Sequence, residues 1–535
     1  MPRNQADASG SGGDHPRNID WSLVASLTIY LIAVTAMWWA IHSRTGEISY
    51  TVDDCYIHGT LSKNLSAHGS FGIVPGEFAA ASSSPLWTIL LAIMFLVTGP
   101  QAWVMALLAT LFGALTIERT NSLMKSLDVG AAERVIVVVA ALAYAPMLPI
   151  ISTGMEHTLH TWTMVGLFVC LVGVSRGTTR PGVLFVWAAL AAGARYESLF
   201  VLPPLLIWLA LRRKWRCAFE LGIGMAVPVM GFAIYSLLHG GYLLPNSLML
   251  KGNLGSAWKI KAFRVMIENQ YLAVLVGLLS LATVAAFLHR RRTGENLAWL
   301  PVSVIVTILI HLQLAQLGWF YRYEGYLIVL GLTAAATLLP LLRNWLRGRP
   351  LAVTLPIYIL IAFATLPLAW RADRANREIV HAAGNIHDQQ VQMAGVARHL
   401  GKNARIAVND LGAVSFLSDA SVLDLIGLGD NSLARAKISH EYGAAKLKSR
   451  LQETRTDFVI CYPSWFGKPD NLPETLIPVE TWHLDDNLIC GAAEVVFYGT
   501  TPDAAVKLAA ALSAYRAEHK PNPLSTNRML AVGSD

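Results

Sequence analysis

The chain has 535 residues, of which 54% are hydrophobic and only 14% are charged, and its mean hydropathy is +0.46. This composition is too apolar for a soluble enzyme of this size and indicates a protein embedded in a lipid bilayer. The formal net charge of +7 comes from short basic clusters beside apolar segments. Because cationic loops tend to stay cytoplasmic, membrane topology explains these clusters. We therefore expect no nucleic-acid partner.

The first 20 residues are polar and rich in Gly and Ser. They predict a disordered cytoplasmic tail, because no small-residue cleavage site follows them as it would in a signal peptide. The five cysteines have neither CxxC nor Cys/His spacing, which argues against a zinc or redox site. Cys461 and Cys490 could pair if their domain is extracytoplasmic.

Spanning helices need about 20 largely apolar residues, and twelve segments of the chain are candidates. They are 22–42, 84–98, 102–118, 132–150, 157–175, 182–194, 198–211, 218–238, 271–289, 298–317, 322–341 and 351–370. Together they predict a polytopic α-helical membrane domain over residues 21–370.

The orientation of this domain follows from Arg and Lys residues in its short loops, which should face the cytoplasm. The basic clusters at 176–180, 212–216, 290–292 and 343–349 place the first loop, 43–83, and everything after residue 370 on the extracytoplasmic side. A cytoplasmic N-terminus and an outside C-terminus require an odd number of crossings. We therefore predict about eleven transmembrane helices, with the short segment 84–98 forming a re-entrant or interfacial helix.

After residue 370 the pattern changes to charged amphipathic stretches that alternate with apolar runs such as RIAV, SVLDLI and DFVICY. Short apolar runs separated by Gly, Asp and Asn are typical of strands, so residues 371–535 should form a soluble α/β domain. The GLGDN stretch lacks the Lys and the spacing of a phosphate-binding P-loop. A cytosolic nucleotide donor therefore has no evident binding site.

The first outside loop contains two adjacent acids, Asp53 and Asp54. Adjacent acids in a loop are usually only solvated. Here, however, they begin a segment with apolar residues at helical spacing, which predicts a helix lying along the interface. An acid that is partly desolvated beside a second acid has the raised pKa that suits a general base. The apolar residues are Tyr56, Ile57, Leu61 and Leu65.

The stretch TVDDCYIHGTLSKNLSAHGSFGIVPGEFAAASSSPLW resembles the first-loop signature of bacterial GT-C glycosyltransferases, close to the terminal arabinofuranosyltransferases of the AftB type. Two departures, Cys55 for Ala and Ala67 for Gly, remove no titratable group. A second specific resemblance lies at 412–430, and shorter, weaker ones lie at 153–159, 194–197, 242–251 and 321–324. The resemblance thus extends over most of the chain after residue 50.

This resemblance implies a GT-C fold and a transferase that uses a polyprenyl-phosphate sugar donor on the outer face of the bacterial inner membrane. The acceptor would be a glycan, a lipid or a protein, and the transfer would invert the anomeric carbon. We expect Asp53 to be the general base, with Asp54 either supporting it or binding a divalent cation such as Mg, Mn or Ca. The two roles could be exchanged.

The donor phosphate requires cations, and Lys251 and Arg322 are the preferred pair, although both could instead extend toward lipid headgroups. For Arg195 and Glu197 we favour a structural ion pair, because both charges lie together at a turn between two helices. Six further residues are candidates for the pocket wall, namely Tyr56, His58, Glu156, Arg195, Tyr321 and Glu324.

The alternative function is a lipid or glycan transporter or flippase, which should show inverted repeats and ionisable residues near the bilayer midplane. Neither is evident, because the ionisable residues concentrate at helix ends and in outside loops. A non-catalytic scaffold would leave the first-loop acids without a role. The sequence selects neither the sugar nor the acceptor.

Overall fold

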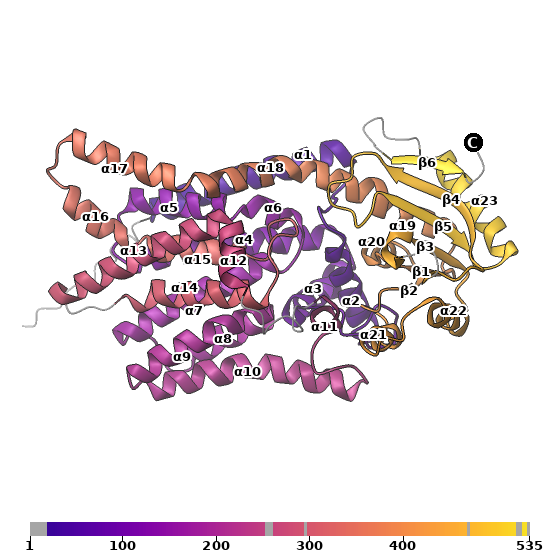
Figure 1. Ribbon diagram of the computed structural model, residues 1–535, viewed down its shortest axis with the longest axis horizontal. Helices are drawn as coiled ribbons and strands as arrows, with labels where there is room; N and C mark the ends of the chain where they lie inside the picture. Colours follow the sequence, from indigo (N-terminus) through magenta and orange to yellow (C-terminus); the bar gives the residue numbers. More distant parts are fainter. Residues whose placement is uncertain (1–18, 252–260, 294–296, 468–470, 520–526, 532–535) are drawn as a thin grey trace, which may run out of the picture.

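The computed structural model describes residues 19–251, 261–293, 297–467, 471–519 and 527–531. A bundle of elongated helices occupies one end of the molecule, and an α/β domain occupies the other (Figure 1). The predicted disordered tail lies outside the described residues except for residues 19 and 20.

The first part contains helices over all twelve apolar segments expected from the sequence and further helices between those segments. They are α1 (Trp21–Thr45), α2 (Asp54–His68), α3 (Pro85–Thr98), α4 (Trp103–Ser126), α5 (Ala131–Tyr144), α6 (Met147–Ser152), α7 (His157–Arg176), α8 (Val183–Ala194), η1 (Tyr196–Val201), α9 (Leu202–Leu211), α10 (Trp215–Leu238), α11 (Asn246–Lys251), α12 (Ala262–Glu268), α13 (Gln270–Thr293), α14 (Trp299–Leu314), α15 (Gly325–Ala335), α16 (Leu338–Leu346), α17 (Leu351–Ala364) and α18 (Leu366–Ile386).

Among the described residues, six helices are long and apolar enough to cross a membrane, or seven if the bent pair of α17 and α18 forms one span. Four shorter apolar helices, at 85–98, 183–194, 196–211 and 299–314, accompany them. The predicted polytopic helical fold is confirmed, whereas the count of eleven crossings stays a prediction.

The short helix α3 follows directly from its local sequence. The Ser84 hydroxyl accepts a hydrogen bond from the Trp87 amide at 3.3 Å, and Pro85 occupies the first turn, where its missing N–H costs nothing. The helix ends at Gly99, whose φ of 71° suits glycine. With 14 residues, α3 is short for a full crossing, in line with the predicted re-entrant or interfacial helix.

The C-terminal domain contains the predicted strands and helices. They are η3 (His387–Val391), α19 (Gln392–His399), β1 (Arg405–Val408), α20 (Gly412–Leu417), β2 (Ser421–Asp424), α21 (Asn431–Ile438), α22 (Ala444–Glu453), β3 (Phe458–Cys461), η4 (Pro463–Phe466), β4 (Ile477–Leu484), β5 (Glu494–Gly499), α23 (Pro502–Glu518) and β6 (Asn527–Ala531).

The described strands form a six-stranded mixed sheet in the order β2-β1-β3-β5-β4-β6. β1 is parallel to both β2 and β3, with Ile406 opposite Val422 and Phe458, whereas β5 and β4 continue the sheet antiparallel. Cys461 and Cys490 are both buried and free, so the disulfide considered from the sequence does not form.

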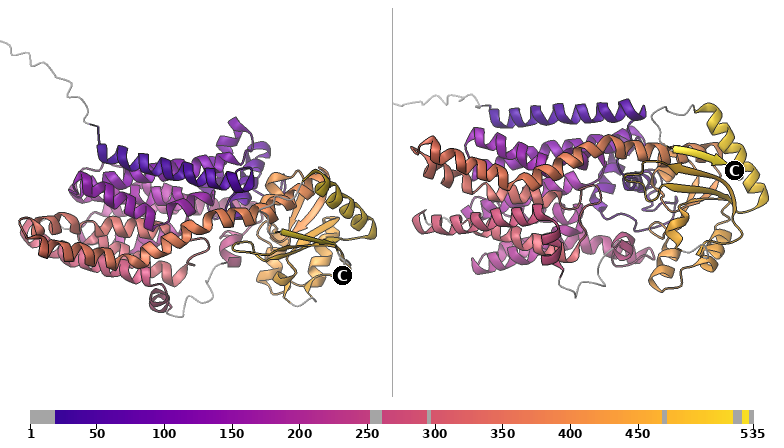
Figure 2. Two further views of the ribbon diagram at one scale, coloured as in Figure 1. Left: turned by 90° about the horizontal axis from the view of Figure 1, so that it is seen from above. Right: turned by 45° about the horizontal axis from the view of Figure 1, so that its top comes forward.

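The helix α18 joins the two parts of the chain. It begins in the bundle, runs through the predicted domain boundary at 370/371, and continues through η3 and α19 into the C-terminal domain (Figures 1 and 2). A continuous helix transmits orientation more rigidly than a loop. The C-terminal domain is therefore held in a defined position against the bundle.

The first loop packs into the core of the C-terminal domain. Ile57 and Leu61 of α2 and Phe71 of the following loop are buried together with Ile406 and Val414 of that domain. In Figure 1, α2 and α3 accordingly lie at the junction between the bundle and the sheet. This junction is where the predicted site residues converge.

Candidate active site

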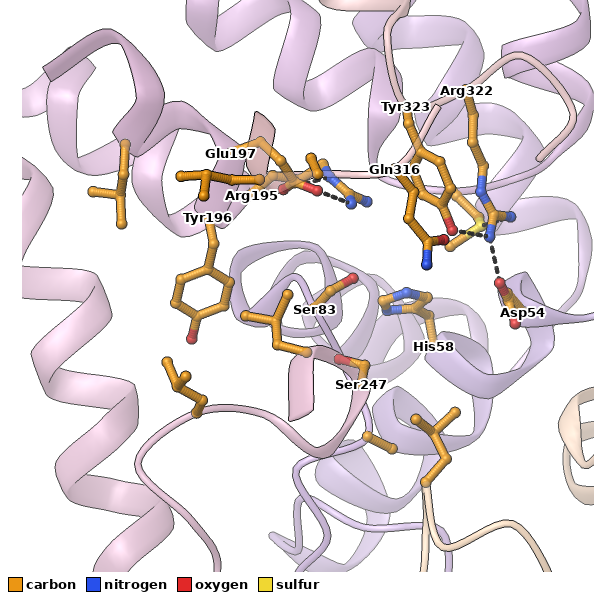
Figure 3. A pocket seen from close by; sticks show the side chains of 18 of the residues that line it. Asp54, His58, Ser83, Arg195, Tyr196, Glu197, Ser247, Gln316, Arg322 and Tyr323 are labelled. Atoms are coloured by element: carbon orange, nitrogen blue, oxygen red, sulfur yellow. Dashed lines mark hydrogen bonds and ion pairs between the residues drawn. The ribbon is translucent and has the colours of Figure 1, made fainter. Parts of the chain in front are cut away.

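A cavity of about 320 Å³ opens between the first loop, the η1 segment, α11 and the loop between α14 and α15 (Figure 3). One part of its wall is polar and carries Asp54, His58, Arg195, Glu197 and Arg322. The other part is apolar and consists largely of Ile57, Leu199, Phe200, Leu244, Leu248 and Leu314. Such a wall suits a ligand with a charged head and an apolar tail.

Asp54 and Arg322 form the central charged contact of this cavity. Nη2 of Arg322 donates a hydrogen bond to Oδ2 of Asp54, and Nη1 lies 2.9 Å from the Met155 sulfur. The Tyr323 ring lies 5.1 Å from the guanidinium, which is within cation–π range. Arg322 is only 2% exposed, so it is held in place by contacts on several sides.

The backbone before Arg322 has an uncommon conformation. Trp319, Phe320 and Tyr321 have φ values of 41°, 59° and 62°, in the left-handed region that side chains other than glycine rarely adopt. Three such residues in succession store strain that the surrounding structure must offset. The resulting turn brings Arg322 to the cavity wall.

A second polar group lies behind the cavity wall around the fully buried Glu156. Its carboxylate pairs with Arg195 through Nη1 and lies 3.4 Å from Nε2 of His58. Arg195 also grips Glu197 with two hydrogen bonds of 3.1 and 2.7 Å. The structural ion pair of Arg195 and Glu197 considered from the sequence therefore forms, and both residues face the cavity as well.

Burial lowers the pKa of His58 below its ordinary value, so the imidazole is neutral near pH 7. We assign the proton to Nε2, facing Glu156, because Nδ1 can then accept from the Ser82 hydroxyl 3.2 Å away. His58 is thereby fixed beside Asp54, one helical turn further along α2.

The structure separates the two adjacent acids of the first loop. Asp54 lines the cavity, whereas Asp53 is absent from its wall and turns toward the C-terminal domain, where its oxygens accept hydrogen bonds from the amides of Gly412 and Ala413 at 2.6 and 2.7 Å. The sequence left the roles of the two acids exchangeable. The structure thus places Asp54, and not Asp53, at the cavity.

Three predicted pocket residues do not line the cavity. The Tyr56 ring is buried between Tyr50 and Phe416, with centroid distances of 5.4 and 6.0 Å. The Tyr321 hydroxyl donates to Glu378 at 2.8 Å. Glu324 pairs with Arg371 instead. These corrections arise because helical spacing and loop position do not determine on which side of a helix or turn the cavity opens.

Glu156 is also not part of the wall but contacts three residues that are, Ser83, His58 and Arg195. The side chain of Lys251, the second predicted phosphate ligand, lies outside the described part of the chain, although its backbone ends α11. The phosphate role of Lys251 stays a prediction.

Gln316 and Tyr323 are among the wall residues that the sequence did not predict. Tyr323 stands in the YRYE element next to Arg322, so its neighbour could have indicated it. Gln316 carries no motif signal in the sequence.

Glu324 should be important for stability. Its carboxylate pairs with Arg371 and accepts hydrogen bonds from the Tyr271 hydroxyl at 3.2 Å and the Gly318 amide at 3.0 Å. Glu324→Gln leaves a buried guanidinium without its counter-charge, which should destabilise the protein by about 3 kcal/mol. Thermal unfolding in detergent should show a clearly lower midpoint.

The matched control is Glu268→Gln, which removes an acid from the exposed pair with Arg264 and should leave the midpoint nearly unchanged. Equal midpoints for the two variants would contradict the structural role of Glu324.

The divalent cation predicted at Asp54 stays a prediction. Among the described residues, no three His, Cys, Asp or Glu side chains cluster as a metal site. Asp54 is also paired with the guanidinium of Arg322, whose charge would repel a metal ion.

The overall fold resembles solved membrane transferases. ArnT from Cupriavidus metallidurans bound to undecaprenyl phosphate aligns with a TM-score of 0.53 at 12% identity, over 90% of this chain and 99% of that one. The Archaeoglobus fulgidus oligosaccharyltransferase tethered to an acceptor peptide aligns with a TM-score of 0.53 at 10% identity, over 90% and 74%. The chain has the GT-C fold.

Other comparisons are less informative. The same A. fulgidus enzyme in complex with zinc and sulfate aligns with a TM-score of 0.52 at 10% identity, over 90% of this chain and 73% of that one. Residues 384–501 match a domain of unknown function, DUF8728, which falls within the C-terminal domain. No curated protein matches the chain significantly. The assignment of the GT-C fold thus rests on alignment over most of the chain. The matched domain family has no assigned activity.

Proposed function

We propose that the chain is a membrane glycosyltransferase that transfers a sugar from a polyprenyl-phosphate donor to an acceptor hydroxyl, with Asp54 as the general base. The observation that carries this proposal is the cavity itself. It combines the Asp54 carboxylate, two guanidinium groups and an apolar wall, which match the acceptor proton, the donor phosphate and the lipid chain respectively.

The reaction is a single displacement. Asp54 takes the proton of the acceptor hydroxyl while the oxygen of that hydroxyl attacks the anomeric carbon of the donor sugar. The bond between that carbon and the phosphate oxygen breaks at the same time. The electron pair leaves with the polyprenyl phosphate, whose developing charge the guanidinium of Arg322 stabilises. Attack from the face opposite the leaving group inverts the configuration of the anomeric carbon.

The ion pair of Asp54 and Arg322 gives the two residues a linked function. A bound phosphate competes with Asp54 for the same guanidinium. As the guanidinium turns toward the phosphate, Asp54 loses a stabilising positive charge and becomes a stronger base. Donor binding would thus activate Asp54 as a base, and without a donor Asp54 would stay paired with Arg322.

We place the protein in the bacterial inner membrane, with the cavity and the C-terminal domain on the extracytoplasmic side. The basic loops support this orientation. The neighbour ArnT was solved with undecaprenyl phosphate, which supports a lipid-phosphate donor. The acceptor would be an envelope glycan, lipid or protein.

The functional test uses membrane vesicles from the native host, because these contain the natural donor and acceptor pools. Vesicles with the protein should release polyprenyl phosphate and extend a glycan, whereas vesicles that contain Asp54→Asn should do neither. Equal product formation by both would contradict the proposal.

The side chains around Asp54 also predict how sugar transfer responds to metal removal. Because Asp54 is paired with a guanidinium and no metal cluster surrounds it among the described residues, we expect EDTA to leave the initial rate within about twofold. A loss that added Mg, Mn or Ca restores would show that a metal ion participates.

A further inference from the structure

Asp53 occupies the capping position of α2 but does not cap that helix. Aspartate at this position usually accepts hydrogen bonds from the first turn of its own helix. Here the side chain makes no capping bond, and its two oxygens accept instead from the amides of Gly412 and Ala413 in α20. The residue therefore forgoes a local contact for one more than 350 positions away in the sequence.

The contact is embedded in a wider interface between α2 and α20. The Thr60 and Ser415 hydroxyls lie 2.8 Å apart. The Phe416 ring packs so closely that a Cβ on Gly59 would lie 2.9 Å from it. These residues lie on the side of α2 turned away from Asp54 and His58, so α20 supports the helix from behind.

Gly412 makes the approach of α20 to Asp53 possible. A Cβ at this position would lie 2.2 Å from the Asp53 carbonyl oxygen and 2.5 Å from its carboxylate oxygen. Such distances are far inside van der Waals contact. Because Asp53 is only 5% exposed, its backbone has little room to retreat, and an added methyl group would shift the start of α2.

Further contacts connect this region with η3 and the sheet of the C-terminal domain. Asp410 accepts hydrogen bonds from Gln390 and from the Tyr462 hydroxyl, both at 3.0 Å. Burial and this neighbouring acid raise the pKa of Asp53 well above its ordinary value. Gln390 belongs to η3, which continues directly from α18. A connected set of contacts therefore runs from the joining helix to Asp53, next to the catalytic base.

We propose that the C-terminal domain positions the catalytic base: α20 holds Asp53, and Asp53 fixes the start of α2 and thereby the place of Asp54. This inference rests on the proposed function of Asp54. It makes Asp53 a positioning residue, and it gives the extracytoplasmic domain a part in the chemistry. A displacement of a catalytic group by about 1 Å can cost roughly 100-fold in rate.

The experiment compares four full-length variants in membrane vesicles from the native host. Gly412→Ala pushes on Asp53 while leaving both acids intact. Asp53→Asn keeps one acceptor oxygen of the two. The double variant combines both changes, and Gly443→Ala is the matched control, because Gly443 has open space around its Cβ position and an extended backbone with φ of 176°.

Two quantities are measured for each variant: the initial rate of product formation, and the affinity of the purified protein for undecaprenyl phosphate. We expect Gly412→Ala and Asp53→Asn each to lower the rate about 10- to 100-fold without any loss of lipid affinity, because Arg322 is untouched and a displaced Asp54 competes less for its guanidinium. The double variant should be no slower than the slower single variant, because both changes break one contact. Gly443→Ala should match the wild type.

Rates within about twofold of Gly443→Ala for both folded single variants would overturn the positioning role. Multiplied losses in the double variant would do so too, as would a parallel loss of lipid affinity, which would indicate general damage. If Gly412→Ala fails to fold, the rate and lipid affinity of Asp53→Asn alone test the positioning role. A wild-type rate or a parallel loss of lipid affinity would then overturn it. Failure of the proposed function is distinct, because Asp54→Asn would then retain the wild-type rate.

Discussion

Replacing Asp54 with Asn should nearly abolish sugar transfer and, at the same time, tighten the binding of lipid phosphate. The rate should fall about 10²- to 10⁴-fold, as expected for loss of a general base. The affinity for undecaprenyl phosphate should rise about tenfold, or ~1.4 kcal/mol, because Arg322 no longer binds an internal carboxylate. Initial rates in vesicles and direct binding to the purified protein measure the two effects.

These opposite changes separate a catalytic Asp54 from a structural one. A structural role would weaken transfer and binding together. The matched control is Asp503→Asn, which changes an exposed acid in α23 and should alter neither quantity. Weaker lipid binding by Asp54→Asn would contradict the competition between Asp54 and phosphate for Arg322.

Replacing Arg322 should remove donor binding and transfer together. Arg322→Met keeps the length of the side chain but removes the charge that faces the phosphate, and we expect affinity for undecaprenyl phosphate to fall about 10- to 100-fold, corresponding to 1.4 to 2.8 kcal/mol. Arg322→Lys should recover part of the affinity, because Lys supplies a point charge without the planar geometry of a guanidinium.

The control for this change is Arg264→Met in α12, because Arg264 is exposed and pairs only with Glu268 in the contacts described for it. It should bind lipid phosphate as the wild type does. If Arg322→Met bound undecaprenyl phosphate with wild-type affinity, the phosphate would lie elsewhere. Arg195, whose guanidinium lies 5.6 Å from the same Tyr323 ring as that of Arg322, would be the next residue to test.

The general architecture followed from the sequence because hydropathy and periodicity are local signals. Each apolar segment became a helix, and RIAV became β1 as its apolar alternation with turn residues suggested. Ser84 and Pro85 similarly encode the start of α3 within three residues. What local signals did not give is how α18 runs unbroken through the predicted boundary, since its polar C-terminal half resembles any solvated helix.

The site was predicted in part for the same reason. Asp54, His58, Arg195 and Arg322 all line the cavity, and each lies in a motif with unusual polar residues at a membrane edge. Which of Asp53 and Asp54 lines the cavity could not be predicted. It depends on Gly412, a residue far away in the sequence whose lack of a side chain allows α20 to reach Asp53. Tyr321 and Glu324 do not line the cavity, because Tyr321 lies in the left-handed turn and its hydroxyl binds Glu378. Glu324 pairs with Arg371 of α18 instead.

The most direct test of the proposed function is mass analysis of envelope glycans from native cells that lack the protein, complemented with either the wild type or Asp54→Asn. We predict that cells without the protein lose one sugar residue from a defined glycan, that the wild type restores it, and that Asp54→Asn does not, although it is present in the membrane. Unchanged glycans in the cells without the protein, or full restoration by Asp54→Asn, would contradict glycosyl transfer at this cavity.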